Sequence, residues 1–241
     1  MNSFKRIALR ASLVALMAAA MGTCLPVNAS VYDIAGDFSI ASNPNGAWTY
    51  GSLSGSTFTP FTVSSAAIGS GYWTTGSGFP VVVGNNTGAP VLYSTWNLPT
   101  DMLNLHPDPT GIASDVRFTA PSAGVYSIGG FFEGVDYAGP TTTDVHILLN
   151  GSSSLFSDNI GSYDVPSTFS LLESLSSGDT IDFAVGYGVD GSYLYDSTGL
   201  SGSITQESLT PIPEPATLFL MGTGLAAIGL RRRRKSGLIS S

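Results

Sequence analysis

A carboxylate and an imidazole stand two residues apart, at Asp144 and His146. On a β-strand these two side chains would point to the same face, where they could act as an acid–base pair. A hydrogen-bonded or solvated surface pair is the simpler interpretation of the same spacing. Glu133 and Asp136 lie close by in the sequence, and paired carboxyl groups are what a polysaccharide hydrolase or lyase would use. Acids are so frequent in this chain that their proximity carries little weight.

The sequence lacks the motifs that other kinds of catalytic or cofactor site require. The sequence contains neither a G-x-S-x-G nucleophile elbow nor an H-E-x-x-H motif. Its two histidines, His106 and His146, are too few for a multi-histidine metal centre within one chain. Residues 186–191 match G-x-G-x-x-G, but a strand-like segment follows where a dinucleotide site needs a helix, which favours a loop. We therefore expect the protein not to be an enzyme.

Carboxylates in glycine-rich and polar segments suit calcium, which prefers oxygen ligands. The candidates for such a site are Asp33, Asp37, Asp190 and Asp196. The alternative is that these four side chains are solvated and only add solubility. Calcium is therefore the one cofactor that the sequence leaves open.

Aromatic side chains offer flat faces on which sugar rings stack. Trp48 and Trp96 each lie in an alternating apolar segment, which favours packing in the core. Trp73 and its neighbour Tyr72 lie among Gly, Ser and Thr residues, so we expect this pair to form an exposed platform for a glycan.

The elements that must position these residues lie between two unusual ends. Residues 1–10 carry three basic side chains and lead into an uncharged apolar run at 11–21, which is the layout of a signal peptide. We expect signal peptidase to cleave residues 1–29 away between Ala29 and Ser30. The only cysteine, Cys24, lies in this leader, and a lipoprotein would need a small residue where Thr23 stands. The mature chain therefore has no disulfide and depends on core packing or bound ions.

The C-terminal end combines three unlike elements in a fixed order. Pro213-Glu214-Pro215 is followed by an uncharged apolar stretch at 216–230 and then by a basic cluster of Arg231, Arg232, Arg233, Arg234 and Lys235. Fifteen residues of helix span about 22 Å, so an inserted helix is short but feasible because long arginines can snorkel. The positive-inside rule keeps the basic cluster in the cytoplasm and places the preceding chain outside the inner membrane. An ordinary tail anchor is the alternative.

This arrangement resembles the PEP-CTERM sorting signal, and the resemblance covers about 25 residues near the terminus. It implies transient anchoring in the inner membrane and cleavage near Pro213-Glu214-Pro215 by exosortase, an integral-membrane cysteine protease. Release or transfer to the cell surface or extracellular matrix would follow. Proteins with this signal are associated with Gram-negative bacteria that make extracellular polysaccharide and biofilm.

The domain between the ends is strongly acidic. Of the 17 Asp and Glu residues only Glu214 lies outside 30–210, and of the nine Lys and Arg residues only Arg117 lies inside it. Such a surface repels nucleic acid and anionic membranes. We expect a single domain over 30–210, with residues 211–241 as the sorting signal.

Apolar residues alternate with small polar ones in short segments bounded by turn residues, which predicts antiparallel strands. The Asn150-Gly151 pair predicts a type I′ hairpin turn. We expect an all-β fold, a single jelly-roll-like antiparallel β-sandwich, flanked by the N-terminal signal helix and the C-terminal transmembrane helix. The expected strands are 31–40, 48–51, 58–63, 91–96, 115–119, 125–132, 144–149, 153–156, 168–175, 180–185, 193–195 and 200–205.

Residues 116–205 have the most regular rhythm of strands and turns, and this stretch resembles the β-sandwich modules of secreted carbohydrate-binding and PEP-CTERM proteins. The sequence therefore indicates an exported, non-catalytic module that associates with extracellular polysaccharide. The alternatives are a calcium-dependent structural or adhesive module and a polysaccharide hydrolase or lyase that would use Glu133 or Asp144.

Overall fold

The computed structural model describes residues 29–76 and 78–208, and these residues form strands and loops without a helix. The reason is visible in β12 (Thr143–Leu149), where Val145 and Ile147 are buried and the intervening Asp144 and His146 are partly exposed. This period of two fits a strand with one face on the core. The expected signal helix, sorting motif and transmembrane helix lie outside the described residues. Within the described part of the chain, no helix is long and apolar enough to cross a membrane.

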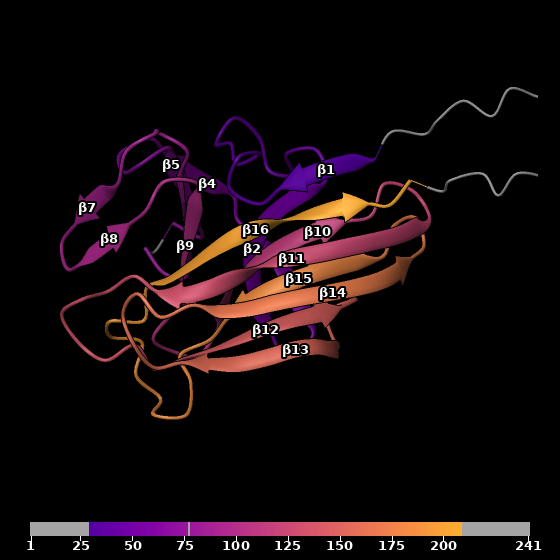
Figure 1. Ribbon diagram of the computed structural model, residues 1–241. Coiled ribbons are helices and arrows are strands. Elements are labelled where there is room, and N and C mark those ends of the chain that lie inside the picture. Colours follow the sequence, from indigo (N-terminus) through magenta and orange to yellow (C-terminus); the bar gives the residue numbers. More distant parts are fainter. Residues whose placement is uncertain (1–28, 77, 209–241) are drawn as a thin grey trace, which may run out of the picture. The chain divides into compact units, whose positions relative to one another are not determined.

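The larger sheet is 8-stranded and antiparallel, and it forms one layer of the molecule (Figure 1). Along it run, in order, β14 (Ser167–Leu175), β11 (Gly124–Gly134), β16 (Thr198–Gln206), β9 (Met102–His106), β6 (Val81–Asn85), β5 (Gly71–Thr74) and β4 (Val63–Ser65), with β1 (Ser30–Asp33) paired to the far end of β16.

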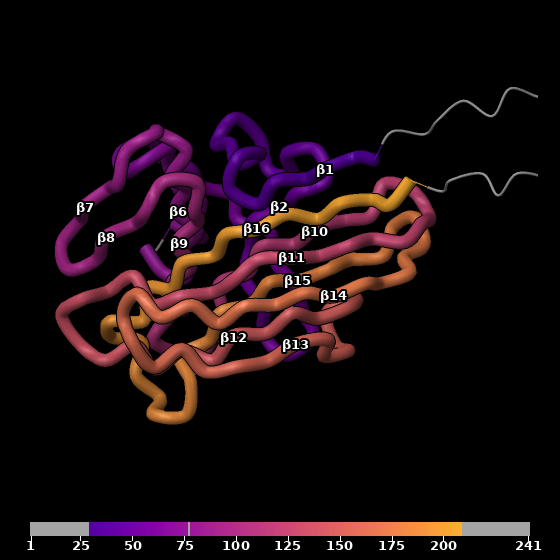
Figure 2. The backbone as a smooth tube through the Cα atoms, viewed as in Figure 1, coloured from indigo at the N-terminus to yellow at the C-terminus, as the bar shows by residue number. Residues whose placement is uncertain are grey.

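The smaller sheet is 6-stranded and forms the second layer (Figure 2). Its order is β13 (Ser153–Ile160), β12, β15 (Thr180–Val185), β10 (Ala113–Thr119), β2 (Trp48–Ser54) and β3 (Thr57–Pro60). From β10 to β16 the chain crosses repeatedly between the two sheets, as it does in jelly rolls. The predicted antiparallel β-sandwich is confirmed.

The main core lies between the two sheets. Its inward faces bring together buried aromatic rings, such as Trp48 and Phe118, whose centroids lie 5.4 Å apart, edge to face. Phe169 of β14 meets Phe183 of β15 at 5.8 Å, so rings from the two layers touch. This contact between layers gives the cysteine-free domain the packed interior that it needs.

A second, smaller core lies on the outer side of the larger sheet. There a hairpin made of β7 (Val91–Tyr93) and β8 (Trp96–Leu98) covers β6. The buried residues of this second core are Val81, Val83, Trp96, Leu98, Met102 and Val135. Part of the larger sheet is therefore covered on both faces.

Some expected elements differ from the structure. Asn150 and Gly151 have φ values of 53° and 72°, which confirms the predicted turn between β12 and β13. Residues 193–195 form a loop instead of the expected strand, and residues 186–191 belong to the same loop between β15 and β16. The expected strand at 91–96 is interrupted by the turn of the β7–β8 hairpin.

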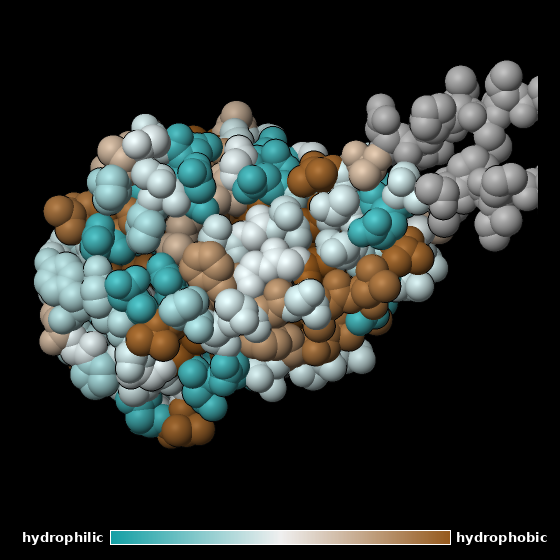
Figure 3. All heavy atoms as spheres, in the orientation of Figure 1, coloured by the Kyte–Doolittle hydropathy of each residue, from teal (hydrophilic) through white to brown (hydrophobic). Residues whose placement is uncertain are grey.

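Strand β16 connects two distant parts of the molecule. Its last residue, Gln206, pairs with Ser30 of β1, so the two ends of the described chain lie side by side (Figure 1). Its first residue, Thr198, pairs with Leu105 of β9 at the opposite end of the strand. Along the middle of β11 and β16 the surface is made of small residues and looks pale in the space-filling view (Figure 3).

Candidate functional site

The outward-facing side chains of β5, β6 and β9 form the floor of a cavity. The registers of these strands align two rows of cross-strand neighbours: Tyr72, Val83 and Asn104 in one row, and Thr74, Val81 and His106 in the other. The intervening residues Trp73, Val82 and Leu105 belong to the main core. The strand period of two therefore separates a floor with polar groups from the apolar interior.

One wall of the cavity is the β7–β8 hairpin. Its turn, Ser94-Thr95, lies between Tyr93 and Trp96, whose ring centroids are 5.5 Å apart. The hairpin is fixed to the segment after β11, because the backbone N–H of Asn97 donates to the carbonyl of Val135 at 2.9 Å. Tyr93 is 52% exposed, so its ring is available to a ligand.

The opposite wall is the loop before β16, which carries Tyr193, Leu194 and Tyr195. Tyr193 packs edge to face against His106, with ring centroids 5.9 Å apart. Phe79 joins them, with its ring 4.4 Å from His106. Three rings from separate parts of the sequence thus meet at this side of the cavity.

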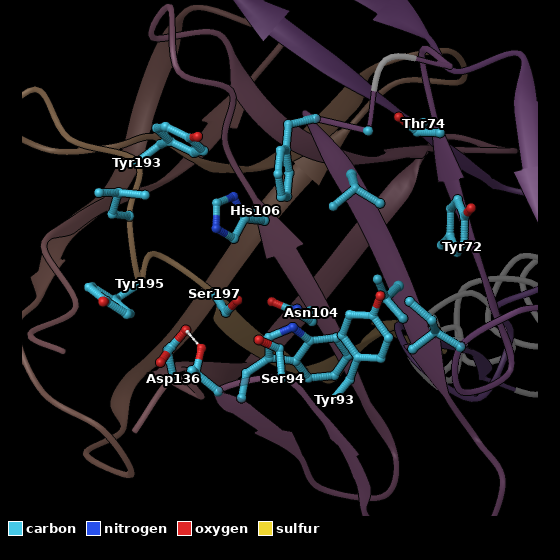
Figure 4. A pocket seen from close by; sticks show the side chains of 18 of the residues that line it. Tyr72, Thr74, Tyr93, Ser94, Asn104, His106, Asp136, Tyr193, Tyr195 and Ser197 are labelled. Carbon is cyan, nitrogen blue, oxygen red and sulfur yellow. Dashed lines mark hydrogen bonds between the residues drawn. The ribbon is translucent and has the colours of Figure 1, made fainter. Parts of the chain in front are cut away.

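The cavity has a volume of about 620 Å³, within the range of known ligand sites. Figure 4 shows Tyr193 and Tyr195 on one side, Tyr72 and Tyr93 on the other, and polar side chains between them. The aromatic lining residues are Tyr72, Phe79, Tyr93, Trp96, Tyr193 and Tyr195, and the polar ones include Asn104, His106, Asp136 and Ser197.

Asp136 is the only Asp or Glu among the described residues that line this cavity. It is buried, and each of its oxygens accepts a hydrogen bond. Thr95 Oγ1 donates to Oδ2 at 2.9 Å, and the backbone N–H of Ala138 donates to Oδ1 at 3.0 Å. These two bonds fix the carboxylate between the hairpin and the segment after β11.

Two further polar groups of the floor are held without a full set of partners. Asn104 is 2% exposed, and its Oδ1 has no hydrogen-bond partner. His106 is also buried, and burial lowers the pKa of its imidazole, although the carbonyl of Pro107 acts in the opposite direction. A buried acceptor without a partner is costly, and a bound ligand or water could supply the missing donor.

The two walls contain unusual backbone conformations. Ser94 and Tyr195, which both line the cavity, have φ values of 53° and 68°. A positive φ is unfavourable for a residue as large as tyrosine. Tyr195 packs over Gly139, where a Cβ atom would lie 2.4 Å from Tyr195 Cδ2. Strain of this kind is found at binding sites, where the surrounding structure holds it.

The structure separates the two residues of the expected aromatic platform. Tyr72 lines the cavity, but Trp73 is 6% exposed and its Nε1 donates to the carbonyl of Ser39 at 2.8 Å. The prediction that Trp73 is an exposed platform is wrong, because alternate residues of β5 point to opposite faces and Trp73 takes the core side.

The four aspartates proposed for calcium fall into two pairs with different partners. Asp33 and Asp37 accept hydrogen bonds from backbone groups of their own turn, and Asp37 also accepts one from Trp48 Nε1 at 3.2 Å. Asp190 and Asp196 both accept from Thr142 Oγ1, at 3.0 and 3.2 Å. Among the described residues, no group of three or more His, Cys, Asp or Glu side chains is placed to hold a metal ion.

Asp144 and His146 lie on the outer face of the smaller sheet, in a second groove of about 480 Å³. His146 Nε2 lies 2.8 Å from Asp144 Oδ2, and the backbone N–H of Gly188 donates to Asp144 Oδ1 at 2.8 Å. These contacts, the hydrogen bond to His146 above all, lower the pKa of Asp144. The same-face placement expected from the spacing is confirmed.

The acidic residues considered for hydrolysis are divided among different places. Asp136 lines the aromatic cavity, and Asp144 lines the second groove. Glu133 lines neither of them; it is buried on β11, and burial raises the pKa of its carboxyl, helped by the nearby Asp164. Their closeness in sequence therefore does not bring these carboxyl groups into one site.

Most of the aromatic cavity was not predicted from the sequence. No sequence motif marks four of its lining residues, because sheet register and loop placement bring them to the cavity. These residues are Phe79, Tyr93, Asn104 and Tyr193. The signal that could have pointed to the loop is Tyr193-Leu194-Tyr195, a cluster of large side chains between turn residues.

The sequence matches one family model. Residues 211–234 match the PEP-CTERM protein-sorting motif, so the chain carries this C-terminal signal for export and sorting. No curated protein matches the sequence.

Several solved structures are similar at a low level. CBM51 from Clostridium perfringens GH95, solved in complex with methyl-galactose, has a TM-score of 0.34 at 9% identity, covering 76% of this chain and 94% of that one. CBM35 from Cellvibrio japonicus Abf62 has a TM-score of 0.30 at 13% identity, covering 74% and 91%. Pika GITRL has a TM-score of 0.26 at 18% identity, covering 39% and 74%. Scores this low carry no argument about what the cavity binds.

Proposed function

We propose that the protein is a non-catalytic polysaccharide-binding module, exported, processed by exosortase and delivered to the cell surface or extracellular matrix. The observation that carries the binding role is the cavity that faces outward from β5, β6 and β9. Aromatic rings stand on both of its sides, and hydrogen-bonding groups lie between them. A sugar ring needs this combination, because its apolar faces stack on aromatic rings while its hydroxyls need polar partners.

The cavity lacks the pair of acids that most glycoside hydrolases use. Such enzymes need two carboxyl groups, one on each side of the scissile bond. Among the described lining residues only Asp136 has a carboxyl group, and both of its oxygens already accept hydrogen bonds from the protein. This favours binding over cleavage.

Alanine variants of the cavity walls test this function. The full chain in mild detergent is assayed by affinity electrophoresis through gels that contain a glucan, a mannan or a galactan. Replacing Tyr193 with alanine removes a stacking face, and we expect the affinity for the retained polysaccharide to fall by about tenfold or more.

Tyr187→Ala is the matched control, because Tyr187 is also a half-buried tyrosine but lines the second groove. It should leave retention nearly unchanged. Equal losses in the two variants would place the binding site elsewhere. Retention by none of the polysaccharides would contradict the proposed function itself.

A calcium-dependent structural module is the second candidate, and one observation favours it. Asp190 and Asp196 share Thr142 Oγ1, and Asp196 Oδ2 is buried without a partner. Carbonyl groups and water would have to complete the shell of six to eight oxygens that calcium takes. A bound ion would raise the melting temperature reversibly, so melting curves with calcium and with a chelator that do not differ would exclude this candidate.

A further inference from the structure

Three polar side chains of the aromatic cavity, those of Asn104, Asp136 and His106, present hydrogen-bond acceptors. Asn104 presents the clearest case, since its buried Oδ1 has no partner in the protein. Asp136 is an acceptor as well, because an ionised carboxylate has no proton to donate. Each of its oxygens accepts one bond from the protein and keeps further acceptor capacity.

The imidazole of His106 adds another acceptor. Its Nδ1 lies 2.9 Å from the carbonyl oxygen of Pro107. A carbonyl can only accept, so Nδ1 carries the proton in this contact. Burial lowers the pKa of His106, which keeps the ring neutral at pH 7. In the neutral ring the other nitrogen, Nε2, then carries a free lone pair.

None of the described residues that line the cavity has a Lys or Arg side chain. Arg117 is the only Lys or Arg between residues 30 and 210. It lies on β10 in the smaller sheet, where its Nε donates to Asp182 Oδ1 and its guanidinium lies 4.0 Å from the ring centroid of Phe58. It is therefore already paired and is not among the residues that line the cavity.

From this arrangement we infer that the cavity selects an uncharged sugar that presents hydroxyl donors, and that it rejects the corresponding uronic acid. Sugar hydroxyls can donate to Asn104 Oδ1, to His106 Nε2 and to the carboxylate of Asp136. The carboxylate of a uronic acid offers only acceptors and a negative charge, and it would meet the buried charge of Asp136 with no cation to offset it. This selectivity rests on the proposed function, because it concerns the same site.

The test compares one polysaccharide in two charge states. A glucan, a mannan and a galactan are each used in two forms. One form is the neutral polymer, and in the other the C6 primary hydroxyl has been oxidised to a carboxylate. The full chain in mild detergent is titrated with all six polymers. We expect binding to a neutral polymer and a loss of at least about tenfold on its oxidation.

Asp136→Asn separates the effect of charge from that of shape. The asparagine keeps the size of the side chain and an oxygen that can accept from Ala138, so the fold should persist. We expect this variant to bind the neutral polymer more weakly and to discriminate less between the neutral and oxidised forms. A change in this ratio would not follow from a purely structural role of Asp136.

The two proposals fail in different ways. If an oxidised polymer binds as tightly as its neutral parent, and Tyr193→Ala still abolishes that binding, the selectivity is wrong and the binding function stands. If Asp136→Asn leaves the ratio unchanged, the carboxylate does not set the selectivity, and the inference fails. If no polymer binds in either form, both proposals fall together.

Discussion

Tyr195 forms part of the cavity wall only because a glycine lies beneath it. Its backbone has a φ of 68°, and its ring packs against Gly139. An added Cβ at Gly139 would lie 2.4 Å from the ring, which is closer than any stable contact. The backbone of Gly139 itself does not need a positive φ, so alanine would act through the ring alone.

Gly139→Ala should therefore displace Tyr195 and weaken binding of the neutral polysaccharide by roughly tenfold, or about 1.4 kcal/mol. Titration of the variant with the polysaccharide that the wild type binds would measure the change. Gly129→Ala is the control, because nothing lies within 4 Å of a Cβ at that position. Unchanged affinity in Gly139→Ala would mean that Tyr195 does not contact the ligand.

At the scale of elements, the loop between β15 and β16 is held by carboxylates. Thr142 Oγ1 donates to Asp190 and Asp196, and the backbone N–H of Gly188 donates to Asp144. Burial, with smaller contributions from the nearby Asp190 and Asp144 carboxylates, raises the pKa of Asp196 to about 6 despite its hydrogen bonds to Thr142. The loop that carries Tyr193 and Tyr195 is thus tied down through a group that titrates near neutral pH.

This raised pKa predicts how stability depends on pH. The folded state holds the proton of Asp196 more tightly than the unfolded chain does. The protonated carboxyl therefore stabilises the fold, and this stabilisation is fully present below pH 3.8 and is lost as the pH rises through about 6. We expect the wild type to lose about 1 kcal/mol of unfolding free energy between pH 5 and pH 7.5 through this group. Asp196→Asn should remove that part of the dependence.

Urea unfolding of the wild type and Asp196→Asn at the two pH values would measure the difference. The comparison isolates Asp196 from Asp115, a fully buried carboxyl whose pKa is also raised, by burial and by the neighbouring Asp182. Parallel pH profiles in the two proteins would contradict the assignment.

The three strands that form the floor of the cavity, β5, β6 and β9, were not predicted from the sequence. Alternation predicted β10, β12 and β15 well, because each has one face in the main core. The floor strands β6 and β9 are buried at every position, since the β7–β8 hairpin and the cavity walls cover their outer face. The apolar run Val81-Val82-Val83 of β6 therefore shows no polar–apolar alternation, and the alternation of β9 is limited to the four residues Leu103-Asn104-Leu105-His106.

The cavity residues were hidden for a related reason. Tyr72 was proposed from its polar neighbourhood, while Trp73, its more conspicuous neighbour, belongs to the core. Local composition cannot decide which of two adjacent residues on a strand faces outward, because a shift of one residue exchanges the faces. That choice depends on the register of β5 with β6, which is a long-range property.

At the scale of the whole molecule, we expect the sorting signal to determine where the domain works. Replacing Pro213-Glu214-Pro215 with three alanines should abolish processing, so the variant keeps its tail and remains in the inner membrane, whereas the wild type loses the tail. Intact-mass measurement and cell fractionation would show this. Thr210→Ala, which lies just outside the matched residues 211–234, is the control and should be processed normally. An intact tail in the wild type would contradict processing.

Strand β16 runs from the cavity to the end of the domain that precedes the sorting signal. It starts beside Ser197 of the cavity and ends at Gln206, next to the residues that lead toward the sorting signal. A polymer held in the cavity and a tether at the C-terminal side would pull β16 lengthwise. Its ladder with β11 runs from Gly134–Thr198 to Tyr126–Gln206, with hydrogen bonds perpendicular to that pull. The bonds would therefore bear the load together in shear, instead of opening one by one.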